Sequence, residues 1–200
     1  MLIDWAVAER AMPGQKRSGD MHLVKVEEKK ALIAVIDGLG HGDDAAEVAK
    51  ATVAVLKECS ISDPLEYMIG LCHKVLLQSR GVVMSLARID AQNDTMLWLG
   101  VGNVDGLLFH SDGSHTLTRS SMVLRGGVVG YQLPSLTQSV VDISRGDILV
   151  MFTDGIRHGF AENVILYDTP QNIADRILAG YSRDNDDALA LVLRYTGAPE

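Results

Sequence analysis

Two aspartates each follow an apolar run and precede a glycine, which places a carboxylate at the mouth of a buried strand. Asp37 ends the apolar run 32–36, and Asp154 follows a second run of this kind. A single buried carboxylate is costly unless it has a partner, so both positions predict a site that uses negative charge. The other two Asp-Gly pairs, at 105–106 and 112–113, are predicted to be plain tight turns.

Three further acids fall at the ends of predicted strands. Asp20 begins a strand after Ser18-Gly19, and Asp186 and Asp187 come just before the last strand. If these strands are neighbours, all of these acids converge at one end of the sheets. Like charges packed together repel by several kcal/mol, as an order of magnitude, at a low effective dielectric constant.

A divalent cation would cancel this repulsion. Ligation by oxygen alone selects a hard metal, Mg²⁺ or Mn²⁺. Two such ions about 3.5–4 Å apart, bridged by one acid, make a site for hydrolysing a phosphate ester. They would lower the pKa of a bridging water and hold the phosphoryl oxygens, so that no serine, cysteine or histidine nucleophile would be required.

The glycine-rich loop after Asp37 has a competing interpretation. Residues 38–43 read Gly-Leu-Gly-His-Gly-Asp and begin like a dinucleotide fingerprint, but Asp43 stands where the third glycine belongs. Together with Asp37 and Asp44, this acid would repel a pyrophosphate. The loop therefore disfavours a nucleotide site.

Two basic residues near the acids are further candidates. His41 could act as a general acid or as a hydrogen-bond donor behind the metal ligands, and a loop histidine without a role is the alternative. Arg17, three residues before Asp20, could reach a substrate phosphate, although such residues are more often simply solvated.

The elements that must position these residues predict an α+β fold. Apolar alternation and turn signals predict strands at residues 3–7, 20–26, 31–36, 82–89, 95–101, 104–109, 114–118, 138–143, 147–152 and 189–193. Apolar stripes predict helices that begin at Asp43, at Asp63-Pro64 and at about Thr169. Helices this few do not alternate with every strand, so the sheets must be largely antiparallel. With no linker and no repeat, residues 1–200 are predicted to form one domain.

The overall charge disfavours some classes of partner. The chain has 26 acidic and 18 basic residues and a formal charge of −8, with no cluster of lysine and arginine. Nucleic acid and anionic membranes are therefore not expected as partners. No stretch approaches about 18 consecutive apolar residues, and no signal peptide is apparent, so a cytoplasmic protein is predicted.

Several short motifs occur in a fixed order along nearly the whole chain. They are Ser18-Gly19-Asp20, Asp37-Gly38-Leu39-Gly40-His41-Gly42, Gly100-Val101-Gly102-Asn103, Leu124-Arg125-Gly126-Gly127, Phe152-Thr153-Asp154-Gly155 and Asp186-Asp187. Each motif alone is weak, but the ordered set resembles the metal-dependent serine/threonine phosphatases, the PPM family. The glycine-histidine-glycine loop is most similar to the SpoIIE-type branch of that family.

The resemblance implies an αββα sandwich, in which two mainly antiparallel sheets pack face to face with helices outside. It also implies two Mn²⁺ or Mg²⁺ ions at one end of the sandwich, with Asp37 bridging both and the Gly38 carbonyl binding one. The acids implied to complete the coordination, directly or through water, are Asp20, Asp154 and either Asp186 or Asp187. A hydroxide bridging the ions would attack phosphoserine or phosphothreonine in line, without a phosphoenzyme.

In its length, the chain resembles the phosphatases that consist of a catalytic domain alone and reset the stressosome in Gram-positive bacteria. This implies phosphorylated regulatory proteins, in particular stressosome scaffold proteins, as substrates. Asp43-Asp44 depart from the family pattern, because apolar or small residues commonly follow the loop. The alternative from a different class is a catalytically silent member of the fold that binds a regulatory partner.

Overall fold

Two β-sheets packed face to face form the centre of the molecule, in a computed structural model that describes residues 1–111, 118–163 and 166–198. Sheet A holds, in spatial order, β1 (Ile3–Arg10), β11 (Ala188–Tyr195), β10 (Ile148–Phe152), β6 (Asp105–His110) and β7 (Thr118–Ser121). Sheet B holds, in spatial order, β2 (Asp20–Glu27), β3 (Lys30–Gly38), β4 (Val82–Asp90), β5 (Thr95–Val101) and β8 (Leu124–Arg125), with β9 (Ser139–Asp142) also paired to β5. Paired strands run antiparallel, except that β5 and β8 are parallel.

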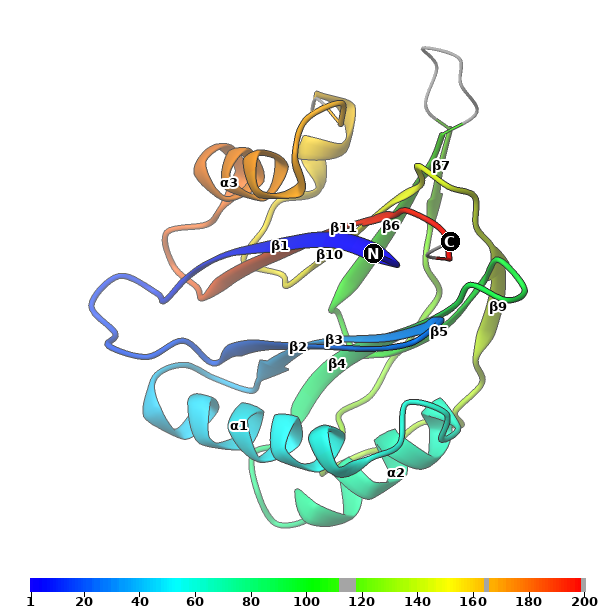
Figure 1. Cartoon of the computed structure of the whole chain (residues 1–200). Coiled ribbons are helices and arrows are strands. Elements are labelled where there is room, and N and C mark those ends of the chain that lie inside the picture. The colour runs from blue at the N-terminus through cyan, green and yellow to red at the C-terminus, as the bar shows by residue number, and fades with distance from the viewer. Residues whose placement is uncertain (112–117, 164–165, 199–200) are drawn as a thin grey trace.

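Helices cover the outer face of each sheet (Figure 1). α1 (Asp43–Glu58) and α2 (Leu65–Val75) lie on sheet B, and α3 (Pro170–Tyr181) lies on sheet A, preceded by the short 3-10 helix η1 (His158–Glu162). The predicted four-layer αββα sandwich of mainly antiparallel sheets is thus confirmed. Across the described ranges, none of the helices has the length and apolarity needed to cross a membrane.

Apolar side chains form three layers that account for this arrangement. Between the sheets, residues such as Ile33 and Trp98 are fully buried. On the outer face of sheet B, Leu32 packs in a second layer with Met68 of α2, and Val150 belongs to a third layer on the outer face of sheet A. Successive residues of β3 serve the inner and the outer layer in turn, which explains why its sequence is an unbroken apolar run.

The order of the strands brings the predicted acids to one end of the sandwich. β2 and β3 form a hairpin in which Asp20 pairs with Asp37. β10 and β11 are antiparallel neighbours in sheet A; Asp154 follows the end of β10, and Asp186 and Asp187 precede the start of β11. Because the end of one antiparallel strand lies beside the start of its neighbour, the acids of sheet A gather at a single edge.

The Asp-Gly pair at 105–106 is the start of β6 and not the tight turn that the sequence predicts. A Cβ atom at Gly106 would lie 2.4 Å from Cη2 of Trp98, so the glycine makes room for a buried indole ring. The predicted turn at 112–113, and all but the last residue of the predicted strand 114–118, lie outside the described residues.

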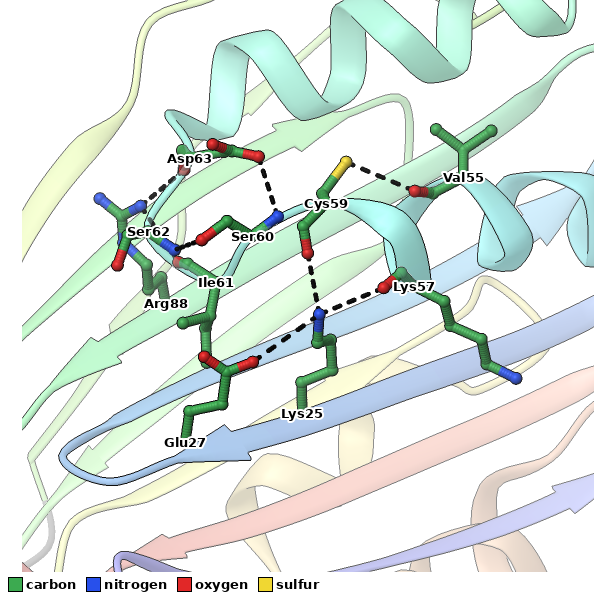
Figure 2. Close-up of polar contacts among 10 residues, drawn as sticks. All are labelled: Lys25, Glu27, Val55, Lys57, Cys59, Ser60, Ile61, Ser62, Asp63 and Arg88. Carbon is green, nitrogen blue, oxygen red and sulfur yellow. Dashed lines mark hydrogen bonds and ion pairs between the residues drawn. The ribbon is translucent and has the colours of Figure 1, made fainter.

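The connection between α1 and α2 corrects a second prediction. α2 begins at Leu65 with Pro64 as its N-cap, so Asp63 lies before the helix and not at its start as predicted. The Asp63 carboxylate instead accepts a hydrogen bond from the backbone N–H of Ser60 at 2.9 Å, and Arg88 of β4 donates to the Asp63 carbonyl at 2.6 Å (Figure 2). The residue before a proline prefers an extended backbone, which leaves Asp63 to close the preceding turn.

Lys25 of β2 connects the end of α1 to sheet B through hydrogen bonds. Its Nζ donates to the carbonyl of Lys57 at 3.2 Å and to that of Cys59 at 2.8 Å (Figure 2). A cation at this position also interacts favourably with the partial negative charge at the C-terminal end of α1. Lys25→Met is expected to lower the free energy of unfolding by about 1–3 kcal/mol, because two carbonyls lose a charged donor.

Chemical denaturation measures this effect. Lys57→Met is a matched control, since that side chain points away from the connection in Figure 2 while its carbonyl is unchanged. An equal loss of stability in both variants would contradict the proposal that the hydrogen bonds of Lys25 stabilise the end of α1.

Candidate metal centre

Asp20 and Asp37 lie side by side at the open end of the β2–β3 hairpin. Asp20 is 4% exposed, and its Oδ2 accepts a hydrogen bond from Thr153 Oγ1 at 2.7 Å. Thr153 Oγ1 in turn accepts from the backbone N–H of Leu189 at 3.0 Å. Since Thr153 follows β10 of sheet A, this pair of bonds joins Asp20 of sheet B to the segment that carries Asp154.

Asp154 is held by contacts on two sides. Asn103, in the loop between β5 and β6, donates from Nδ2 to Asp154 Oδ2 at 2.8 Å. Arg183 donates from Nε to the Asp154 carbonyl at 3.0 Å, and its backbone N–H donates to the Gly155 carbonyl at 2.7 Å. These bonds fix the direction of the carboxylate and engage only one of its two oxygens.

The two adjacent acids before β11 have different surroundings. Asp187 is 4% exposed, and both of its oxygens accept backbone N–H bonds, Oδ1 from Met12 and Oδ2 from Gly19, each at 2.7 Å. Asp186 is half-buried, and its Oδ1 accepts from the backbone N–H of Asp187 at 2.9 Å. Asp187 therefore braces the segment before β2, whereas Asp186 keeps an oxygen for another partner.

Burial and mutual repulsion raise the pKa of several of these carboxyl groups. Burial, followed by the charges of Asp154, Asp186 and Asp187, raises the pKa of Asp37 to about 8. The pKa of Asp20 lies well above its ordinary value because of burial and then the charge of Asp37. Burial and then the charge of Asp154 also raise the pKa of Asp186. In each case the charge of at least one other predicted acid contributes after burial, so these carboxylates lie within electrostatic range of one another.

No lysine, arginine or histidine in the described ranges forms an ion pair with these acids, which are Asp20, Asp37, Asp154, Asp186 and Asp187. In the same part of the chain, no three acidic, histidine or cysteine side chains close on one point as metal ligands. A cation here would therefore contact one or two carboxylates at a time, with water completing its coordination. Mg²⁺ is usually bound in this way, and an all-oxygen donor set suits hard cations, so the residues fit such an ion.

Both Asp-Gly pairs of the centre need glycine for close contacts of the backbone. A Cβ atom on Gly38 would lie 2.2 Å from the carbonyl oxygen of Ala45 in α1. A Cβ atom on Gly155, in the turn after β10, would lie 1.8 Å from the carbonyl oxygen of Asp187. The glycines thus allow α1 and the start of β11 to press against the strand ends that carry the acids.

His41 lies at the rim of the centre. It is exposed, and its Nδ1 is 3.4 Å from Nε2 of Gln15. Its charge is the weakest of the influences on the pKa of Asp186, which it lowers. The loop after Asp37 therefore places an imidazole beside the acids without a direct contact to them.

Arg17 lies on the flank of α1. It forms ion pairs with Glu47 at 2.9 Å and with Asp43 at 3.7 Å. It also lines a surface hollow of about 330 Å³ that reaches Asp20 and His22. Its guanidinium is thus near the centre but already faces two acids.

The residues that hold the acids in place were not among the predicted site residues. Thr153 and Asn103 stand inside the motifs, and a polar side chain next to a predicted ligand is the signal that would have found Thr153. Nothing in the sequence pairs Asn103 with Asp154, which lies 51 positions further along the chain. Arg183 falls outside the motifs altogether.

Comparisons with known proteins find relatives in both sequence and fold. The family described as Stage II sporulation protein E (SpoIIE) matches residues 27–196. Phosphoserine phosphatase RsbX of Bacillus subtilis (strain 168) is 28% identical over 144 residues, which cover 72% of this chain and 69% of RsbX.

Solved structures share the whole architecture. A chain from work on the bacterial stressosome, a modular system adapted to control secondary messenger signalling, is 29% identical with a TM-score of 0.86, and the match covers 96% of this chain and 99% of that one. The structure of RsbX in complex with magnesium is 21% identical with a TM-score of 0.85, and the match covers 97% of this chain and 96% of that one.

Proposed function

The chain belongs to the SpoIIE family of serine/threonine phosphatases, and from this premise we propose that residues 1–200 form one catalytic domain that uses divalent cations to dephosphorylate regulatory proteins. The observation that carries the proposal is the group of five acids from four strand ends. Burial and then the charges of Asp154, Asp186 and Asp187 raise the pKa of Asp37 to about 8, and the described residues offer these acids no ion pair. Such an arrangement is costly for a fold unless cations bind there.

We assign the ligands from the surroundings of each acid. Asp37 pairs with Asp20 in sheet B and feels the charges of three acids of sheet A, so it would be the carboxylate that two ions share, with the Gly38 carbonyl as a further ligand. Asp20, Asp154 and Asp186 would complete the coordination, while Asp187 holds the backbone. When bound, the cations supply an acidified water and neutralise charge on the phosphoryl group. Mg²⁺ is the first candidate, since the related RsbX was solved with magnesium, and Mn²⁺ is the alternative.

The other residues of the centre orient these ligands. Thr153 holds Asp20 through Oδ2, and Asn103 holds Asp154 through Oδ2, so each carboxylate presents its second oxygen in a fixed direction. His41 is exposed on the loop that follows Asp37, and in this proposal it would give a proton to the leaving serine or threonine oxygen. Arg17, at the hollow beside Asp20, is a candidate contact to the substrate.

Phosphorylated stressosome-type proteins are the proposed substrates. RsbX is named as a phosphoserine phosphatase, and a structure from the bacterial stressosome matches 96% of this chain. We therefore take the substrate to be a phosphoserine or phosphothreonine on a regulatory protein.

Hydrolysis of a phosphoserine peptide with Mg²⁺, with Mn²⁺ and with excess chelator tests the proposal. Release of phosphate that needs either metal is expected. Equal activity in excess chelator would refute the proposal that hydrolysis depends on a metal ion. Tight binding of a phosphorylated regulatory protein without any hydrolysis would instead identify a catalytically silent binding module.

Asp186 and Asp187 are expected to respond differently to removal of their charge. Asp186→Asn should reduce metal-dependent hydrolysis by about 100-fold with little loss of stability, because it removes a ligand with a raised pKa. Asp187→Asn should lower the free energy of unfolding by about 1–3 kcal/mol, because an amide accepts only one of the two backbone N–H bonds from Met12 and Gly19. Activity and thermal unfolding are measured on both variants, and the opposite pattern would assign the ligand to Asp187.

A further inference from the structure

An arginine that no motif includes lies directly on the loop that follows Asp37. Gly40 has φ +97°, and a Cβ atom at this residue would lie 2.8 Å from Nη1 of Arg80. The backbone N–H of Leu39 donates to the carbonyl of Gly81 at 3.1 Å, which ties the two segments together. The Arg80 guanidinium therefore rests against the loop that leads from Asp37 into α1.

The partner of Arg80 is an acid at the start of α1. Nη2 donates to Asp44 Oδ2 at 2.6 Å, and within the described ranges this is the one polar contact of the Arg80 side chain. The two side chains are 51% and 70% exposed, so the ion pair itself contributes little to stability. A guanidinium carries five N–H donors, and the bond to Asp44 uses one of them, on Nη2.

The charge of the molecule makes a cation at this place useful. The formal charge is −8, and five carboxylates surround the centre. A phosphoserine side chain carries nearly two negative charges, so it meets repulsion on approach unless a cation faces it. Arg80 faces one acid, whereas Arg17 on the other flank faces two.

We propose that Arg80 binds the phosphoryl oxygens of the substrate at the edge of the acidic centre, with Asp44 holding the guanidinium in position. Arginine binds a phosphoryl group through two parallel N–H bonds, and Arg80 would use N–H donors that Asp44 does not occupy. The proposal rests on the phosphatase function, and it extends that function by naming the residue that recognises the phosphoryl group.

The test measures inorganic phosphate binding and phosphopeptide hydrolysis in the same variants. Calorimetric titration with phosphate in the presence of Mg²⁺ is expected to show an affinity about tenfold or more lower in Arg80→Ala, with Arg80→Lys in between because it keeps the charge but loses the fork. The KM for the phosphopeptide should rise in the same ratio. Asp44→Asn should raise it less. Arg176→Ala is the matched control, since Arg176 is 48% exposed and pairs with Asp168 at the far helix α3.

The outcomes separate this proposal from the function on which it rests. Phosphate affinity in Arg80→Ala within twofold of that of the wild type, or no measurable phosphate binding by the wild type, would overturn the role of Arg80. A wild-type protein that binds phosphate through Arg80 but does not hydrolyse the peptide would leave this role standing and refute the phosphatase function. If thermal unfolding shows that Arg80→Ala does not fold, Arg80→Lys is compared with the wild type instead. An unchanged phosphate affinity and an unchanged KM in Arg80→Lys would also overturn the role of Arg80.

Discussion

Asp37→Asn is expected to reduce metal-dependent phosphopeptide hydrolysis at least about 1,000-fold while the protein stays folded. The substitution replaces one carboxylate oxygen by an NH₂ group of similar size, so the register with Asp20 and the contact of Gly38 with α1 are preserved. What disappears is the carboxylate that the acids of both sheets surround. Without its charge, neither of two ions would be held at the distance that phosphate ester hydrolysis requires.

The stability of the same variant separates a ligand from a structural acid. The pKa of Asp37 is raised to about 8, so its charged form is unfavourable in the metal-free fold. Asp37→Asn should therefore leave the metal-free protein as stable as the wild type or more stable. Asp175→Asn, on the exposed face of α3, is the control for the same chemical change. Retained hydrolysis in Asp37→Asn, or loss of its fold, would refute the assignment.

The position of the acids could be predicted because each marks the end of a strand that is easy to recognise. Residues 32–36 are apolar throughout, since β3 is covered on both faces, and Asp37 is the first polar residue after them. Antiparallel neighbours then place strand ends together without further information. The fold class followed from the same patterns, because few helices and many short strands leave little choice but antiparallel sheets.

Contacts between distant segments could not be predicted in the same way. Thr153 and Asp20 are 133 positions apart, and the bond between them depends on how one sheet is placed on the other. Gly106 resembles a turn residue locally, but the ring of Trp98 from the other sheet decides its place in β6. Arg80 carries no local signal, since only the fold brings it to Gly40.

The choice between Asp186 and Asp187 shows the same limit at the scale of one residue. Both are acids before an apolar strand, so their sequence surroundings are alike. The direction of the Asp187 side chain depends on backbone N–H groups of the segment that precedes β2, more than 160 positions earlier, whereas Asp186 accepts from the N–H of its neighbour Asp187. Two such groups bind Asp187, and this supports Asp186 as the acid that faces the ions.

In excess chelator, the stability of the protein is expected to fall as the pH rises from about 5 to about 8. The ordinary pKa of an aspartate is 3.8, and in the folded protein burial and then the neighbouring carboxylates raise the pKa of Asp37 to about 8. The folded state therefore binds this proton more tightly than the unfolded state does. The resulting stabilisation is complete below the ordinary pKa and is lost as the pH rises through the folded value. Asp20 and Asp186 act in the same direction.

Thermal unfolding across this pH range, with chelator and with Mg²⁺, measures the effect. The loss should be on the order of several kcal/mol at most, and Mg²⁺ should reverse it, since a cation favours the charged carboxylates that protons otherwise neutralise. The informative quantity is the difference in stability between the wild type and Asp37→Asn, because every other ionisable group is common to the two proteins. That difference should grow with pH in chelator and shrink when Mg²⁺ is added. Parallel curves for the two proteins would mean that Asp37 does not carry the repulsion, and the bridging position would then have to pass to another acid.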